Sequence, residues 1–102
     1  MSTSHKTDQY TESDVEVMDV KIPMYRVILY NDDYTTFDFV IEILKQVFKK
    51  SDAEAKKITL SVHQKGRGLA GTYPKEIADM KVMEVHRRAE AAGYPLRAGV
   101  EG

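Results

Sequence analysis

Five consecutive side chains, those of Asn31, Asp32, Asp33, Tyr34 and Thr35, bring an amide, two carboxylates, a phenol and a hydroxyl into one short segment. Their oxygens are mainly hydrogen-bond acceptors, which suit a donor-rich cation such as an ammonium group and would repel a phosphate. The segment follows an apolar run, at the kind of sheet edge where binding sites are common. The same residues also favour an ordinary Asx-rich turn and helix cap, so composition alone leaves both interpretations open.

The three histidines are further candidates for chemistry. A neutral imidazole accepts a hydrogen bond through one nitrogen while the other nitrogen orients the ring, so His63 could complete the acceptor set of residues 31–35. The sequence does not place it there, because a lone histidine is more often a surface or cap residue. We interpret His5 and His86 as such bystanders, one in the N-terminal segment and the other on a charged helix face.

Neither a metal centre nor a catalytic centre is indicated. The absence of cysteine excludes disulfides, thiolate clusters and cysteine nucleophiles. Asp32, Asp33 and His63 are a poor match to known metal-ligand spacings. Ser51 and Ser61 have no nucleophile motif around them. We therefore expect no metal, no cofactor and no enzymatic activity.

Composition predicts a single soluble domain. The 102 residues are 42% hydrophobic and 30% charged, and no apolar run approaches the ~20 residues that a membrane span requires. Fifteen Lys and Arg against sixteen Asp and Glu give a net charge of −1, which argues against a nucleic-acid partner. Because the N-terminus has no apolar signal segment, we predict a cytoplasmic protein with no membrane partner.

The elements that must position the polar segment follow from the hydrophobic pattern. Residues 1–21 have too few apolar positions to offset the entropy of ordering, so we predict a disordered, flexible extension before a single domain of residues 22–102. Residues 25–30 are β-branched, aromatic or otherwise apolar at nearly every position, with Arg26 as the exception, which predicts a buried strand. Thr35 and Asp38 form a variant capping box, which predicts a helix from this point. The expected core-facing stripe of this helix is Phe37, Val40, Ile41, Leu44, Val47 and Phe48.

A second capping box at Ser51 begins the next helix, which we expect to end at Gly66 in the left-handed conformation. Alternating apolar residues between 58 and 62 also fit a strand, but the cap and the length favour a helix. We interpret residues 66–68 as a flexible turn and residues 69–73 as a short strand or extended loop.

Pro74 suits the first position of the longest helix, which ends before Gly93 and Pro95. Its expected inner face is Ile77, Ala78, Val82, Val85, Ala89 and Ala92. Residues 96–100 could return as a last strand beside the first. The order βααβαβ predicts an α+β fold with a small antiparallel three-stranded sheet packed against three helices.

The run MYRVILYNDDYTTFDFVIEIL, followed by LSVHQKGRGLAGTYPKEIADMK and then YPL, resembles ClpS, the bacterial N-end rule adaptor of the Clp protease. The resemblance covers about residues 23–100. The combination of YNDDYT, VHxxG and GxYPKEIAxxK is far more specific than any single piece. It implies an adaptor that acts as a monomer, grips a free N-terminal Leu, Phe, Tyr or Trp of a protein substrate, and hands that substrate to a hexameric Clp AAA+ unfoldase for degradation.

The resemblance also implies roles for single residues. The α-amine and the first peptide group of the substrate would be contacted, directly or through water, by Asn31, Asp32 and His63. Asp33 would tune the local electrostatic field. The lining of the side-chain pocket would be Thr35, Phe37, Val40, Thr59, Val62 and Leu96.

Contacts with the unfoldase are implied for a different part of the chain. Glu76 and Lys81 match positions that contact the N-terminal domain of the unfoldase, although both are also ordinary surface charges. The N-terminal extension would be engaged during delivery.

Phe37 and Thr59 depart from the family pattern, which commonly has Met at both positions. We hypothesise an altered residue preference within the bulky apolar class. The alternative function is a structural protein-interaction domain without amine recognition, because the expected fold also resembles the C-terminal domain of the ribosomal stalk protein.

Overall fold

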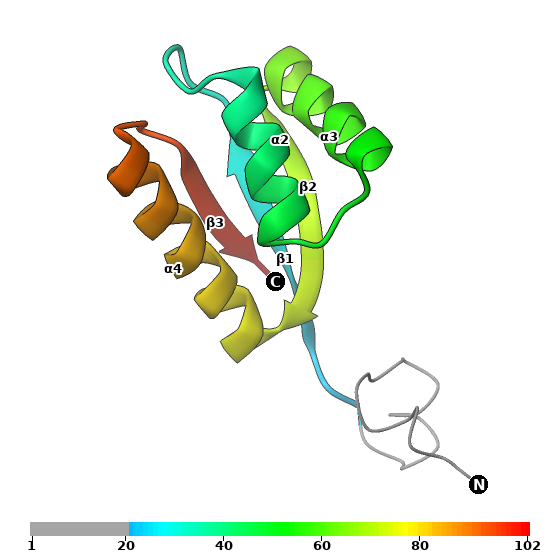
Figure 1. The fold of residues 1–102 in the computed structure, drawn as a ribbon. Coiled ribbons are helices and arrows are strands. Elements are labelled where there is room, and N and C mark those ends of the chain that lie inside the picture. Colours follow the sequence, from blue (N-terminus) through cyan, green and yellow to red (C-terminus); the bar gives the residue numbers. More distant parts are fainter. Residues whose placement is uncertain (1–20) are drawn as a thin grey trace, which may run out of the picture.

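The computed structural model describes residues 21–102 (Figure 1). Its elements are β1 (Met24–Tyr30), α2 (Phe37–Gln46), α3 (Asp52–Lys65), β2 (Arg67–Pro74), α4 (Lys75–Ala92) and β3 (Arg97–Glu101). The predicted βααβαβ order and the α+β fold are confirmed. The extension predicted for residues 1–21 lies, apart from Lys21, outside the described residues.

The sheet is antiparallel and has β1 at its centre, in the order β2-β1-β3. β1 pairs along its whole length with β2, and from Arg26 to Tyr30 it also pairs with β3. The register shifts between Val27 and Ile28, whose partners are Gly71 and Leu69, so Ala70 is the extra residue of a β-bulge in β2. The prediction that the last strand lies beside the first is confirmed.

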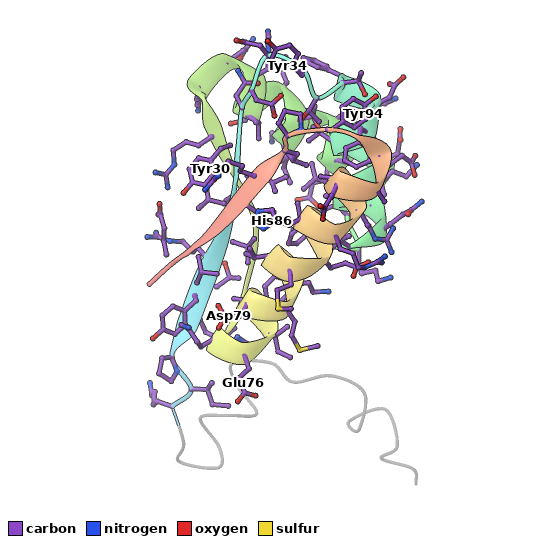
Figure 2. All side chains as sticks on the ribbon, turned by 90° about the vertical axis from the view of Figure 1, so that its left-hand side faces the viewer. Tyr30, Tyr34, Glu76, Asp79, His86 and Tyr94 are labelled. Atoms are coloured by element: carbon purple, nitrogen blue, oxygen red, sulfur yellow. The ribbon has the colours of Figure 1, made fainter. Side chains whose placement is uncertain are left out.

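The core lies between one face of this sheet and the helices, which cover the same side of it (Figures 1 and 2). Val27 and Leu29 point into the core from β1 because side chains alternate along a strand. They meet Leu44 of α2 and Val85 of α4, which are also fully buried. No helix among residues 21–102 combines the length and the apolar character that crossing a membrane would require.

The start of α2 differs from the prediction by one residue. Thr36 is the N-cap, because its hydroxyl accepts a hydrogen bond from the Phe39 amide at 3.2 Å. Thr35 does not cap the helix; its hydroxyl donates to the Asp32 carboxylate at 2.7 Å. The prediction of Thr35 as the cap was wrong because its hydroxyl is bonded to the Asp32 carboxylate, and the adjacent Thr36 caps the helix in its place.

The predicted apolar stripes of α2 and α4 both contain errors. Phe37, expected in the core, is 46% exposed, whereas Ile43, which was not predicted, is only 2% exposed. On α4, Ala78, Val85 and Ala89 are buried as expected and Val82 packs against the core. Ile77 and Ala92, however, lie on the exposed surface. Helical periodicity alone does not show how wide the buried stripe is.

The predicted limits of α3 are confirmed. The Ser51 hydroxyl accepts from the Glu54 amide at 3.1 Å, and Gly66 ends the helix with a φ of +88°. The strand alternative for this segment is therefore wrong. The predicted turn over residues 66–68 is wrong for its last two residues, because Arg67 and Gly68 already belong to β2.

α4 begins one residue later than predicted. Pro74 is the last residue of β2 and occupies the N-cap position, so the first helical residue is Lys75. The predicted end is confirmed, with Gly93 in the left-handed conformation at a φ of +82°.

His86 is more than a bystander on α4. Its Nε2 accepts a hydrogen bond from the backbone amide of Ala98 at 3.0 Å, which ties the helix to the outer edge of β3 (Figure 2). His86 is exposed on α4, as predicted, but its structural contact with β3 was not predicted. His5 lies outside the described residues.

Gly68 allows β2 to approach α3 closely, and this contact yields a test of the fold. A Cβ at position 68 would lie 2.6 Å from Cγ2 of Val62, a stiff β-branched side chain. We expect Gly68→Ala to lower the free energy of unfolding by ~1–3 kcal/mol through overpacking and to shift the Val62 methyl resonances. Urea unfolding and methyl NMR measure the two effects.

Gly66→Asn is the matched control, because a Cβ at position 66 meets nothing within 4 Å and Asn tolerates the left-handed conformation. It should cost less stability than Gly68→Ala. Equal losses in the two variants would contradict this account.

Candidate binding site

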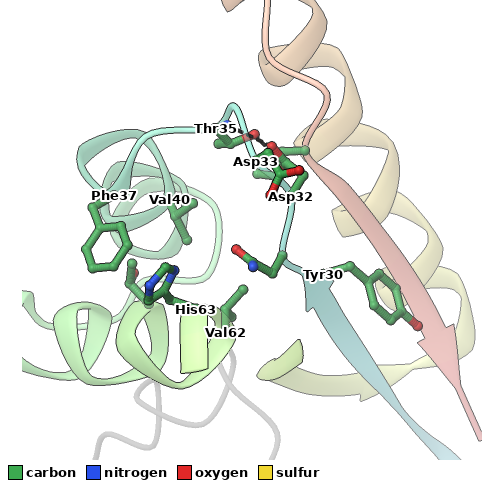
Figure 3. Close-up of a pocket in the computed structure, with 11 residues that line it drawn as sticks. Tyr30, Asp32, Asp33, Thr35, Phe37, Val40, Val62 and His63 are labelled. Carbon is green, nitrogen blue, oxygen red and sulfur yellow. Dashed lines mark hydrogen bonds between the residues drawn. The ribbon is translucent and has the colours of Figure 1, made fainter. Parts of the chain in front are cut away.

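A cavity of about 230 Å³ opens at the end of β1, between the starting turn of α2 and the last two turns of α3 (Figure 3). Its lining consists of Tyr30, Asn31, Asp32, Asp33, Thr35, Phe37, Val40, Thr59, Val62, His63 and Leu96. All ten residues predicted for amine binding and for the side-chain pocket thus surround one cavity. Tyr30 is the addition; its ring points away from the cavity (Figure 3).

The Asp32 carboxylate organises the segment that forms the cavity mouth. Oδ1 accepts from the amides of Tyr34 at 2.8 Å and Thr35 at 2.7 Å, and Oδ2 accepts from the Thr35 hydroxyl. Partial burial raises the pKa of Asp32, but the hydrogen bonds from Thr35 and Tyr34 outweigh it and hold the pKa below its usual value. The Asx-rich turn that composition allowed is therefore present, and it is part of the site.

A backbone hydrogen bond joins this segment to α3. The Asn31 amide donates to the Gly66 carbonyl at 3.0 Å. Because Gly66 ends α3, the bond sets the Asn31 main chain beside the last turn of that helix, where Val62 and His63 lie. This bond, between residues 35 positions apart in the sequence, thus holds the two halves of the cavity together at the point where β1 ends.

His63 and Phe37 form the opposite side of the mouth. Their ring centroids are 5.1 Å apart and their planes are inclined by 68°, an edge-to-face contact between α3 and the start of α2 (Figure 3). Both residues are exposed, as are Asn31 and Asp33. The contact explains why Phe37 leaves the core stripe: its ring packs on the imidazole instead.

The base of the cavity is buried and mainly apolar. It is formed by Val40, Thr59, Val62 and Leu96, all at most 6% exposed. Thr59 is the one buried polar residue of the described chain, and its hydroxyl donates to the Ala55 carbonyl at 2.8 Å. The cavity therefore combines a mouth rich in acceptors with an apolar base.

Glu76 and Lys81 lie outside this cavity, on the first half of α4. Figure 2 shows Glu76 at the opposite end of the molecule from Tyr34, near the point where the described chain begins. Lys81 is not a simple surface charge. Its ammonium donates to the Val47 carbonyl at 2.8 Å and lies 5.5 Å from the centre of the Tyr73 ring, so it also holds α4 to the end of α2.

The chemistry of the cavity is that of binding. Within residues 21–102 no group of three or more His, Cys, Asp or Glu side chains is arranged to hold a metal ion. Carboxylate, amide and imidazole groups at the mouth can accept hydrogen bonds from a cationic donor, and the apolar base can take up a hydrophobic group. The chain is thus a small α+β protein whose cavity has the groups to hold a ligand with both a cationic and a hydrophobic part.

Comparison with known proteins gives the family. A family model described as ATP-dependent Clp protease adaptor protein ClpS matches residues 21–99. The adapter protein ClpS of Nautilia profundicola is 54% identical over 95 residues, which cover 93% of this chain and 96% of that protein. That of Desulforapulum autotrophicum is 47% identical, with 91% and 89% coverage. The chain belongs to the ClpS family of Clp protease adaptor proteins.

A solved structure supports the same assignment. Agrobacterium tumefaciens ClpS2 bound to L-phenylalaninamide superimposes with a TM-score of 0.76 at 32% sequence identity. The match covers 79% of this chain and 98% of that one.

Asp32 gives a prediction with a defined pH dependence. The pKa of Asp32 is lowered in the folded state. Its ionised carboxylate therefore contributes fully to stability above ~3.9, the pKa of an Asp in the unfolded chain. This contribution is lost as the pH falls through the lower pKa of the folded state. We expect Asp32→Asn to be less stable than the wild type above about pH 5, with a difference that shrinks toward acidic pH.

Urea unfolding at a series of pH values measures this difference. Asp33→Asn is the control, because no residue between 21 and 102 is seen to donate a hydrogen bond to the Asp33 carboxylate. A stability loss in Asp32→Asn that stays constant from neutral to acidic pH would show that the carboxylate charge does not hold the turn.

Proposed function

We propose that this adaptor binds the free N-terminal residue of its protein substrates in the described cavity and delivers them to a Clp AAA+ unfoldase. The observation that carries the proposal is the pairing, in one cavity, of an acceptor-rich mouth with an apolar base. An N-terminal residue with a large hydrophobic side chain has the matching pair of groups, an ammonium and an apolar side chain attached to one carbon.

The mouth suits the ammonium. A protein N-terminus carries several donors and has an ordinary pKa of about 7.7–8.0, so it requires convergent acceptors and no nearby cation. Asn31 and a neutral His63 supply acceptors from the two sides of the mouth, and Asp33 adds negative charge. Asp32 already accepts three hydrogen bonds from its own turn. Its main contribution is therefore to hold the acceptors in place while it adds a second negative charge.

The base suits the first side chain. Val40, Val62 and Leu96 present apolar surface, and full burial of a Leu or Phe side chain is worth about 1.5–3 kcal/mol. The structural relative from Agrobacterium tumefaciens is bound to L-phenylalaninamide, which has a free amine, an aromatic side chain and an amide in place of the next peptide bond. These are the groups that the cavity of this chain is suited to take.

Delivery would use surfaces away from the cavity. Glu76 is exposed at the far end of α4, so a partner can reach it while a substrate occupies the cavity. The family resemblance assigns Glu76 and Lys81 to the N-terminal domain of the unfoldase and residues 1–21 to engagement during delivery. Glu76 is the cleaner residue to test, because Lys81 also has an internal role.

Acetylating the N-terminus of a peptide distinguishes the proposed function from that of a structural interaction domain without amine recognition. We expect a Leu-initiated peptide to bind, and its acetylated form to bind at least about fivefold more weakly, because acceptors at the mouth lose their donors. Affinity for the free peptide should also fall above about pH 8 as the amine loses its proton. Fluorescence anisotropy with an internal-sequence control measures both effects, and indifference to acetylation would favour the structural interaction domain.

Glu76→Arg tests the delivery surface. We expect slower degradation of a Leu-initiated reporter by the reconstituted Clp protease, because reversing this charge opposes docking, whereas peptide affinity should match the wild type. Glu90→Arg makes the same charge change near the other end of α4 and is the control. Equal rates of reporter degradation with the wild type and with Glu76→Arg would show that Glu76 takes no part in delivery.

A further inference from the structure

We propose that the outer edge of β2 binds residues 14–20 of this chain as an added strand, in a groove between β2 and α3. The segment itself lies outside the described residues, and the argument for it rests on the groove, on charge and on the point of attachment. The groove and the cavity at the end of β1 have no lining residue in common. The proposal is therefore independent of the function proposed for that cavity.

The groove follows an exposed edge of the sheet and has a volume of about 420 Å³. β2 is an edge strand, because β1 is its one neighbour in the described sheet. Within residues 21–102, no side chain or loop forms a hydrogen bond with the backbone of residues 69–72 outside the ladder with β1. An extended peptide can add to such an edge, where its main chain supplies affinity and its alternate side chains supply specificity.

The walls of the groove offer apolar surface and positive charge. Leu69 of β2 is 48% exposed, and Ile58 of α3 is partly buried. Lys50 and Lys57 also line the groove, and neither forms an ion pair with another described residue. Because Glu54 is the one acidic side chain of the lining, the lining has a net positive charge. A peptide that alternates apolar and acidic residues fits both properties.

Residues 14–20, with the sequence DVEVMDV, have this pattern. Val15 and Val17 alternate with Asp14 and Glu16, so an extended chain places the apolar pair on one face and the acidic pair on the other. A segment this short cannot bury enough apolar surface to hold a strand by itself. The edge of β2 would supply the backbone partners that it lacks.

Charge separates the N-terminal segment from the domain. Residues 1–20 contain one Lys and five Asp or Glu, a net charge of −4. Residues 21–102 contain fourteen Lys and Arg against eleven Asp and Glu, a net charge of +3. The near-neutral total of the chain thus conceals an acidic segment joined to a basic domain. Electrostatic attraction favours contact between the two.

The point of attachment puts the segment within reach of the groove. Met24 begins β1 and pairs with Pro74 at the end of β2, two residues beyond Thr72 in the groove lining (Figure 1). Residues 21–23 can span about 10 Å, which matches two strand spacings of ~4.8 Å from β1 across β2 to the outer edge. Residues 14–20 would then run parallel to β2 and cover ~23 Å in extended form.

A spin label beside the segment tests this placement in the full chain. Because the chain has no cysteine, Ser13→Cys provides a single attachment site for a nitroxide. We expect the label to broaden the amide resonances of Leu69 and Gly71 and to leave those of the last turn of α4 sharp. In a mixture of labelled molecules and isotope-enriched molecules without the label, no broadening should occur. Broadening in that mixture would assign the groove to a second copy and overturn the proposal.

Hydrogen exchange tests the added strand itself. Val15→Pro together with Val17→Pro removes two backbone donors, which an added strand needs. We expect those amides of residues 69–72 that β1 does not bond to exchange at least about threefold faster in this variant, within the range of one net hydrogen bond. Thr3→Pro together with Thr7→Pro is the matched control outside the segment and should leave their exchange unchanged.

Lys57→Glu tests the charge complementarity. We expect this variant to weaken the broadening from the Ser13→Cys label, and Glu16→Lys in the same chain to restore it. Lys65→Glu makes the same charge change on α3 outside the groove lining and is the control. The affinity of Lys57→Glu for a Leu-initiated peptide should match that of the wild type, because Lys57 does not line the cavity.

Two results would overturn the proposal: a label that broadens no resonance of the groove, and equal exchange rates in the wild type and the double proline variant. Either result would leave the function proposed for the cavity untouched, since acetylation of a peptide tests that function separately.

Discussion

The hydrogen bond from the Asn31 amide to the Gly66 carbonyl fixes the geometry on which the site depends. Gly66 adopts the left-handed conformation that ends α3, and the chain then enters β2, which pairs with β1 from the next residue onward. Asn31 is therefore anchored where the sheet and the helix meet. One such bond is worth only about 0.5–1.5 kcal/mol, so its importance lies in the register it imposes and not in its contribution to stability.

The remainder of the site follows from this anchor. Asp32 gathers the next three residues into a turn, Thr36 starts α2, and Phe37 reaches back to the imidazole of His63. The first two steps use contacts within a few residues, and the third joins α2 to α3. The base needs long-range packing, because it draws on α2, α3 and the residue before β3. A preformed mouth over a packed base is suited to a ligand whose polar and apolar parts are attached to the same atom.

Local signals made the fold largely predictable, while specific side-chain contacts produced the errors. Ser51 and Gly66 delimit α3 with side-chain and backbone chemistry that needs no tertiary context. The choice between Thr35 and Thr36 depended on the Asp32 carboxylate, and the exposure of Phe37 depended on His63. Neither dependence is visible in a periodic pattern. The grouping of the ten cavity residues came from the family resemblance, since spacing alone did not bring Asn31 and His63 together.

The bond between His86 and Ala98 has a consequence for how molecules of this chain meet one another. β3 is an edge strand, and the outward amides of an edge strand are a template on which a strand of a second molecule can add. The imidazole of His86 already accepts a hydrogen bond from the Ala98 amide, near the start of that edge. A strand that added to β3 at this position would therefore have to displace the His86 imidazole from the Ala98 amide.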